Sequence, residues 1–198
     1  MRRTNLVLAT AVAAFLTAGA ARAEAPSAEA VVKTYADIAE AMYADSLSTA
    51  QSLKTAVQAL LDTPNDKTLA AARDAWKAAR VPYQQTEGLR FGNPAVDDWE
   101  GKVNAWPLDE GLIDYVDAGS YGDSSDENPL YTLNVIGSTK LQIGPEEIDA
   151  TTITKDLIVN LHEAQEVEAN VATGYHVIEF LLWGQDLNGT GPGAGNRP

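Results

Sequence analysis

The feature that most constrains the fold of this chain is a run of apolar residues spaced for one long helix. Between Val31 and Leu60, apolar residues recur at intervals of three to five positions, mostly three or four. This spacing is typical of one face of an amphipathic α-helix, and Ser27 precedes it as a good N-cap. The residues at 62–65, Asp-Thr-Pro-Asn, are expected to end the helix. The chain is therefore predicted to begin its folded part with a helix that buries one stripe.

A second helix is expected directly after this turn, from about Lys67 to Phe91, with Asp66 as its cap. Pro82 falls inside it, and an interior proline removes a backbone donor and clashes with the preceding turn. We therefore expect a kink near 78–81 or a break into two helices. Two antiparallel helices joined by a short turn predict the first half of a helical bundle.

Helical periodicity is weaker in the rest of the chain. Residues 92–107 are predicted to form a loop that contains Trp99 and Trp106, and residues 118–144 are rich in Gly, Ser, Asp and Asn. Little alternation of the kind that builds a sheet is present, so the predicted fold class is all-α. Further helices are expected at 108–116, from Pro145, at 155–165 after Thr154, and at 166–183 before Gly184.

The charge of the chain excludes several classes of partner. It has 28 acidic and 14 basic residues, a formal net charge of −14, two histidines and no cysteine. So acidic a chain neutralises few phosphates, which argues against nucleic acid and anionic membranes as partners. Without cysteine, thiolate metal centres and disulfides are excluded, and any metal must be held by nitrogen and oxygen donors.

The first 23 residues have the form of a signal peptide. Arg2 and Arg3 are followed by an apolar run at 6–18, and residues 21–23 read Ala-Arg-Ala, the small-x-small pattern of a cleavage site. The run is shorter than the ~20 residues of a membrane span. We therefore expect export to the periplasm or the medium, a mature domain at 24–198, and no membrane span in the mature form.

The most informative motif is the Gly174–Glu179 segment, Gly-Tyr-His-Val-Ile-Glu. It places His176 and Glu179 three residues apart, on one face of a helix whose other residues are apolar. Such a pair in a low-dielectric place needs a partner. Two interpretations stand: a structural His–Glu hydrogen bond, or a metal or catalytic site. The other histidine, His162, falls in a polar segment expected to be a solvated helical face.

Glu87 is the best candidate for a third ligand, because it lies on the inward stripe of the second helix. Its alternative role is that of a partner for Arg90 or Arg80. Asp109 and Glu110 stand in the first turn of a predicted helix, where acidic residues complement the helix dipole.

Four aromatic residues are expected in the core, although a cluster of them would also suit a flat organic ligand such as haem. They are Trp76, Tyr83, Trp106 and Trp183.

Four blocks of the sequence carry a resemblance to a known family. The segment 174–186 is similar to the GxHxxE signature of the imelysin family, also called the insulin-cleaving membrane protease or iron-regulated protein A family. The segments 80–92, 103–115 and 192–198 extend the resemblance over nearly the whole mature chain. The resemblance implies a pair of related helical bundles with the GxHxxE region near their junction, so this chain looks like an N-terminal half, truncated at its C-terminus.

The resemblance also implies a role in iron uptake. We therefore expect iron, or zinc or another divalent transition metal, to bind at His176 and Glu179, either as the ion or as an iron-bearing ligand. Glu87 is expected as third contributor because of its place on the inward stripe. An uptake-system protein is the expected partner. Two alternatives remain open: a metallopeptidase of the imelysin class that uses the same pair, and a non-catalytic surface interaction module in which the pair is structural.

Overall fold

The structure is a computed structural model that describes residues 25–187. The expected signal peptide at 1–23 and the block at 192–198 lie outside the described residues. The chain divides into two compact units, residues 1–38 and 39–198. In the first unit, the Ser27 hydroxyl accepts a hydrogen bond from the Ala30 amide at 3.1 Å, so the predicted cap is confirmed.

Two long helices occupy the positions that the periodicity predicts. Helix α2 spans Ala28–Asp62 and ends at the expected residue, and α3 spans Asp66–Gln85. The cap of α3 is Asn65 and not the predicted Asp66: the Asn65 side chain accepts bonds from the Lys67 and Thr68 amides, and the Thr68 hydroxyl accepts one from the Asn65 amide. This reciprocal arrangement satisfies more of the free amides of the first turn than Asp66 could.

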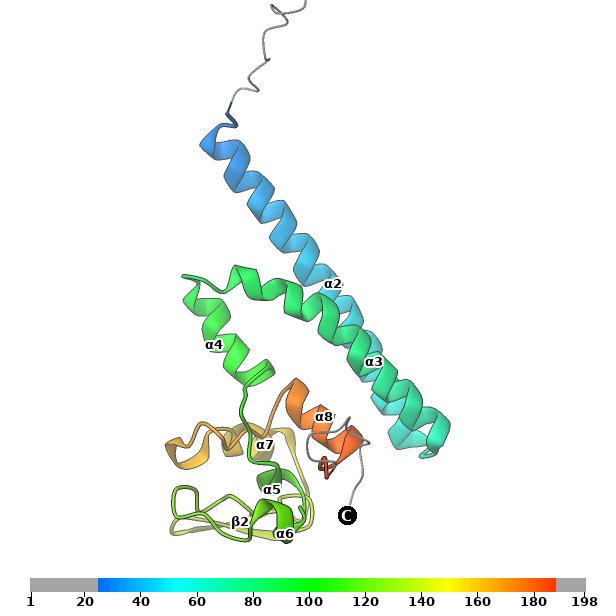
Figure 1. Cartoon of the computed structure of the whole chain (residues 1–198), viewed down its shortest axis with the longest axis vertical. Coiled ribbons are helices and arrows are strands. Elements are labelled where there is room, and N and C mark those ends of the chain that lie inside the picture. Colours follow the sequence, from blue (N-terminus) through cyan, green and yellow to red (C-terminus); the bar gives the residue numbers. More distant parts are fainter. Residues whose placement is uncertain (1–24, 188–198) are drawn as a thin grey trace, which may run out of the picture. The chain divides into compact units, whose positions relative to one another are not determined.

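Pro82 does not break α3, which Figure 1 shows as one curved helix. The helix instead stops at Gln85 and continues as a 3₁₀ turn, η1, over Thr86–Leu89, short of the predicted end at Phe91. A single proline removes one backbone hydrogen bond, and the neighbouring turns can hold the helix together around it.

The segment predicted as a loop at 92–107 contains a helix, α4, at Pro94–Val103. Pro94 at its first turn, Asp97 in that turn and Lys102 in the last turn are favourable end residues that the sparse apolar spacing concealed. Two short helices follow in the polar region, α5 at Glu110–Ile113 and α6 at Ala118–Tyr121.

The prediction of a helix from Pro145 is wrong, because this segment forms a β-hairpin. Strand β1 (Lys140–Ile143) pairs antiparallel with β2 (Glu146–Asp149), and Leu141 lies opposite Ile148. The turn uses Gly144 at φ +56°, a conformation that glycine adopts without strain. Apart from this small sheet the described fold is helical, so the predicted class is confirmed as mainly α.

The last helices are shorter than predicted. Helix α7 spans Lys155–Leu161 with Thr154 as its cap, as expected, and the 3₁₀ turn η2 covers Ala164–Glu166. Helix α8 spans only Tyr175–Trp183, because Glu166 is left-handed, Val167 is extended, and Gly174 at φ +96° caps the helix. Gly184 ends α8 as predicted.

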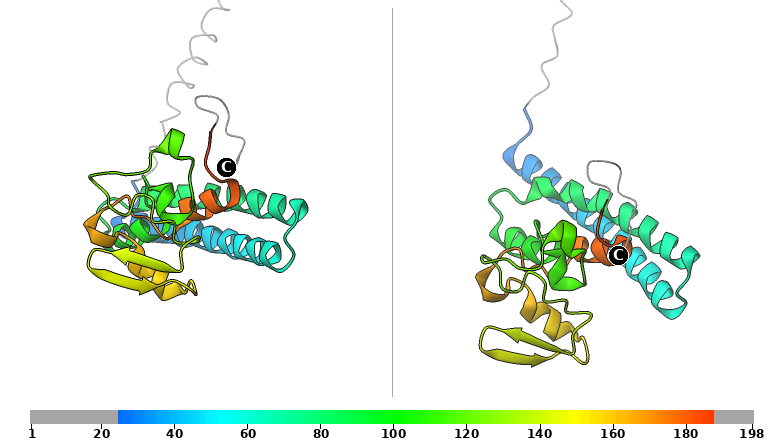
Figure 2. Two further views of the ribbon diagram at one scale, coloured as in Figure 1. Left: turned by 90° about the horizontal axis from the view of Figure 1, so that it is seen from below. Right: turned by 60° about the horizontal axis from the view of Figure 1, so that its bottom comes forward.

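Three apolar clusters hold the second unit together. Leu53 of α2 packs with Ala79 and Tyr83 of α3 and Tyr175 of α8, and Figures 1 and 2 show these helices side by side. A second cluster joins the hairpin, α5 and α7 and is called the hairpin lobe below. It consists of Leu112, Leu130, Val135, Leu141, Ala150, Leu157 and Leu161.

Helix α5 belongs to two of these clusters. Leu112 packs in the hairpin lobe, whereas its neighbour Ile113 packs in the third cluster with Val177 and Phe180 of α8. Successive carbonyls of residues 111–113 accept hydrogen bonds from the successive amides of residues 134–136, at 2.9–3.0 Å. This ladder fixes α5 to the lobe on one side, while Ile113 packs against α8 on the other.

Among the described residues, the structure contains no helix with the length and apolar character that crossing a bilayer requires.

Candidate functional site

The first turn of α8 is fixed tightly against α3 and α4. Gly174 caps the helix at φ +96°, and a Cβ built on it would lie 2.5 Å from the carbonyl oxygen of Val103, at the end of α4. The Thr173 hydroxyl donates to the Lys102 carbonyl at 2.7 Å, and the Trp76 indole donates to the Tyr175 carbonyl at 2.9 Å. Backbone approach of this kind requires glycine.

His176 and Glu179 lie one turn apart on α8 and contact each other, as their spacing predicts. Nδ1 of His176 is 3.0 Å from Oε2 of Glu179. The His176 side chain is 17% exposed and that of Glu179 is 41% exposed, so the pair stands at the surface of the helix and within reach of a ligand.

The two side chains line a pocket of about 680 Å³. Trp106 forms part of the wall, with its ring centroid 5.0 Å from that of His176, and Trp76 packs edge-on against Trp183 at 5.4 Å. Of the aromatic residues expected in the core, Tyr83 is buried, but Trp106 is 70% exposed. The residues that line the pocket are Trp76, Lys77, Trp106, Leu108, Glu110, His176, Glu179, Phe180, Trp183, Gly184 and Asp186.

Two carboxylates that the sequence did not assign to the site share this pocket. Glu110 comes from α5, where its predicted role was that of a helix-dipole residue, and Asp186 follows α8. Burial raises the pKa of the Glu110 carboxyl, and the nearby Asp186 and Glu179 carboxylates raise it further. The buried Gln185 accepts a bond from the Asp117 amide at 2.7 Å and thereby holds the segment that carries Asp186.

These charges give the pocket its sign. The described lining contains three carboxylates, those of Glu110, Glu179 and Asp186, and a single ammonium group, that of Lys77. A concave surface with an excess of one sign concentrates counter-ions of the other sign. The pocket therefore favours cations.

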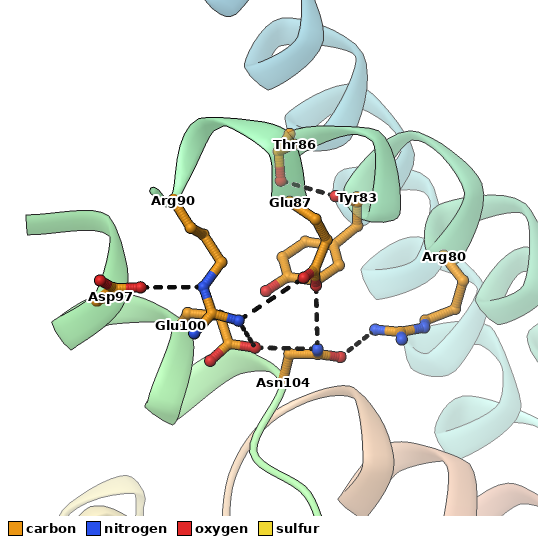
Figure 3. A network of polar contacts seen from close by, with 8 residues as sticks. All are labelled: Arg80, Tyr83, Thr86, Glu87, Arg90, Asp97, Glu100 and Asn104. Carbon is orange, nitrogen blue, oxygen red and sulfur yellow. Dashed lines mark hydrogen bonds and ion pairs between the residues drawn. The ribbon is translucent and has the colours of Figure 1, made fainter. Parts of the chain in front are cut away.

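Glu87 does not lie in this pocket but in a separate polar network on α3, η1 and α4 (Figure 3). Its carboxylate is 3.7 Å from the Arg90 guanidinium and accepts a bond from the Asn104 amide at 3.5 Å. The alternative of an Arg90 partner is thus confirmed, whereas Arg80 donates to Asn104 instead.

Arg90 is the centre of that network. It also contacts Asp97 at 3.0 Å and Glu100 at 3.2 Å, so Asp97 belongs to an ion pair. Tyr83 lies next to this network. Burial raises the pKa of its hydroxyl, and the Glu100 and Glu87 carboxylates raise the pKa further. The network joins α3 to α4 and so supports the Val103 carbonyl on which Gly174 packs.

The prediction that His162 lies on a solvated helical face is wrong. Its side chain is 7% exposed, and its Nδ1 accepts a hydrogen bond from the Ala172 amide at 3.4 Å. The chain turns at residues 163–166 and returns over it, since the left-handed angles there redirect the backbone.

Within residues 25–187, no three His, Asp or Glu side chains converge closely enough to hold a metal ion by themselves. The His176–Glu179 pair and the two further carboxylates thus form an acidic wall and not a closed cage. Metal binding there requires additional ligands from water or from a bound chelator.

The imelysin family matches residues 39–198, which is most of the chain and includes the pocket. The chain belongs to the imelysin family. A curated relative, the iron-regulated protein A of Synechococcus elongatus, is 29% identical over 110 residues. That region is 55% of this imelysin chain but only 31% of the relative, so the match spans about a third of the relative's length.

Proposed function

We propose that this imelysin-family chain binds iron, or an iron-bearing ligand, in the pocket around His176 during iron uptake. The family and the iron-regulated relative support an iron-related role. The observation that carries the proposal is the His176–Glu179 pair, 3.0 Å apart, in a pocket that also contains Glu110 and Asp186.

The donor chemistry of the pocket suits iron. Imidazole nitrogen and carboxylate oxygen are ligands of ferrous and ferric iron as well as of zinc. These metals can therefore bind without the cysteine thiolates that the chain lacks. The excess of negative charge attracts the cation, and the exposed Trp106 beside His176 offers a flat surface to an organic chelator.

The sequence supports the cellular side of the proposal. The charged start, short apolar run and Ala-Arg-Ala site of residues 1–23 are typical of a signal peptide. Export would place the chain in the periplasm or the medium, where an uptake-system protein could receive the iron from it.

The test is a titration of the purified chain with Fe²⁺ under anaerobic conditions, followed by calorimetry and by metal analysis after gel filtration. We expect the parent to bind iron and His176→Ala to lose binding, because the imidazole is removed. Glu163→Gln is the matched control, since it removes a carboxylate beside the other histidine, outside the pocket. Equal iron affinity of parent and His176→Ala would overturn the proposal.

A further inference from the structure

The two ring nitrogens of His176 have different surroundings. Nδ1 faces Glu179 Oε2 at 3.0 Å. Nε2 makes no hydrogen bond to any residue of the described chain, and the ring lines the pocket beside Trp106. Among residues 25–187, one nitrogen therefore has a protein partner and the other has none.

This difference selects one tautomer of the imidazole. An ionised carboxylate only accepts hydrogen bonds, so the nitrogen that faces Glu179 must carry the proton. In the neutral ring, the lone pair is then on Nε2. A histidine whose second nitrogen donates to a carboxylate is the usual arrangement at metal sites, where the carboxylate fixes the ring and increases its basicity.

We propose that Glu179 is a positioning residue that acts through His176, and that Nε2 of His176 is the nitrogen that binds the metal. The inference rests on the proposed function, because it assigns roles within the same pocket. It changes the role that the sequence suggested for Glu179, which was that of a direct ligand. The first ligand sphere is then completed from the open side of the pocket.

The composition of the chain makes the assignment directly measurable. The chain has two histidines, so the ¹⁵N spectrum of the labelled protein contains only two imidazole rings. His162 is an internal reference of opposite type: its Nδ1 accepts the Ala172 amide, which places its proton on Nε2. At a pH where both rings are neutral, we expect His176 to be protonated on Nδ1 and His162 on Nε2.

Titration with Zn²⁺, a diamagnetic ion, then locates the bound nitrogen. We expect the Nε2 resonance of His176 to move while Nδ1 keeps its proton. Loss of the Nδ1 proton with a shift at Nδ1 would overturn the inference and leave the proposed metal site standing. If neither nitrogen moves and calorimetry with Zn²⁺ and Fe²⁺ detects no binding, both the inference and the proposed function fail.

Three variants separate positioning from direct ligation. Glu179→Ala removes the acceptor, so we expect a mixture of His176 tautomers and about 10–100-fold weaker Zn²⁺ binding. Glu179→Gln retains an acceptor oxygen and should recover the tautomer and most of the affinity. Glu110→Gln removes a pocket carboxylate that makes no bond to His176, and should leave the tautomer unchanged. The proposal would be contradicted if Glu179→Gln bound Zn²⁺ as weakly as Glu179→Ala does.

Discussion

The indole of Trp76 donates a hydrogen bond to the carbonyl of Tyr175, at 2.9 Å, and so joins α3 to the residue that precedes His176. The bond spans 99 positions of the sequence. It shows that the orientation of the candidate ligand depends on a helix that contributes no ligand itself.

Trp76→Phe tests this bond. Loss of a partly buried hydrogen bond should lower the free energy of unfolding by about 1 kcal/mol and weaken metal binding through His176. Urea unfolding with calorimetry measures both. Trp99→Phe is the control, since Trp99 is 46% exposed and should change stability by no more than about 0.5 kcal/mol. Equal effects of the two substitutions would show that the bond is unimportant.

Gly174→Ala should destabilise the protein by about 1–3 kcal/mol, because its φ is +96° and the new Cβ would lie 2.5 Å from the Val103 carbonyl oxygen. Gly101→Ala is the matched control: Gly101 lies within α4 and nothing approaches its Cβ position within 4 Å. That change should stabilise the protein by about 0.5–1 kcal/mol. Thermal unfolding gives the sign of each effect, and undiminished stability of the Gly174→Ala variant would contradict the packing described.

Glu87→Gln distinguishes a structural residue from a ligand. The Glu87 and Arg90 side chains are 42% and 35% exposed, so loss of their ion pair should cost less than about 1 kcal/mol. We expect the Fe²⁺ affinity to stay within about twofold of the parent, because Glu87 contacts Arg90 and Asn104 and does not line the pocket, and changes at sites that share no contacts act independently. A tenfold loss of affinity with unchanged stability would instead establish Glu87 as the third ligand.

The pKa of Glu110 predicts a dependence of stability on pH. Because it is raised in the folded state from an ordinary value of 4.5, the native protein binds more protons than the unfolded chain over the window just above that value. The free energy of unfolding from this group therefore falls as pH rises through the window. Glu110→Gln should be more stable than the parent at pH 7, with the difference vanishing below about pH 4. Thermal unfolding across this range provides the measurement.

We expect no metal-dependent peptide hydrolysis by this chain. A metallopeptidase needs about three protein ligands and a separate general base, which typically contributes about 10²–10⁴-fold. No such cluster of three occurs in the described residues. The assay incubates zinc-loaded and iron-loaded chain with unfolded insulin chains and a random peptide library. Cleavage that needs both metal and Glu179, as judged with Glu179→Gln, would favour the metallopeptidase alternative.

The sequence predicted the long helices and the His176–Glu179 contact because both depend on local spacing. Helical periodicity locates α2 and α3, and two residues three positions apart on a helix are neighbours whatever surrounds them. The hairpin was missed because its strands have only four residues each, and Pro145 before two glutamates has the appearance of a helix start.

The rest of the site could not be predicted in this way. Glu110 and His176 come from separate helices, and only tertiary packing brings their side chains to the same pocket. Glu87 was assigned to the site because it shares the stripe of α3, but α3 gives way to η1 at Thr86, and the carboxylate then meets Arg90 and Asn104.

The position of α5 between two apolar clusters affects how the metal affinity of the pocket can change during evolution. Glu110 is carried by a helix that the hairpin lobe holds through Leu112 and the ladder to residues 134–136, whereas His176 is carried by α8. Leu130 and Leu141 belong to the lobe and not to the pocket lining, so we expect substitutions there to shift α5, and with it Glu110, relative to His176. Random mutagenesis followed by selection for tighter or weaker metal capture should recover such lobe residues alongside those of the pocket wall.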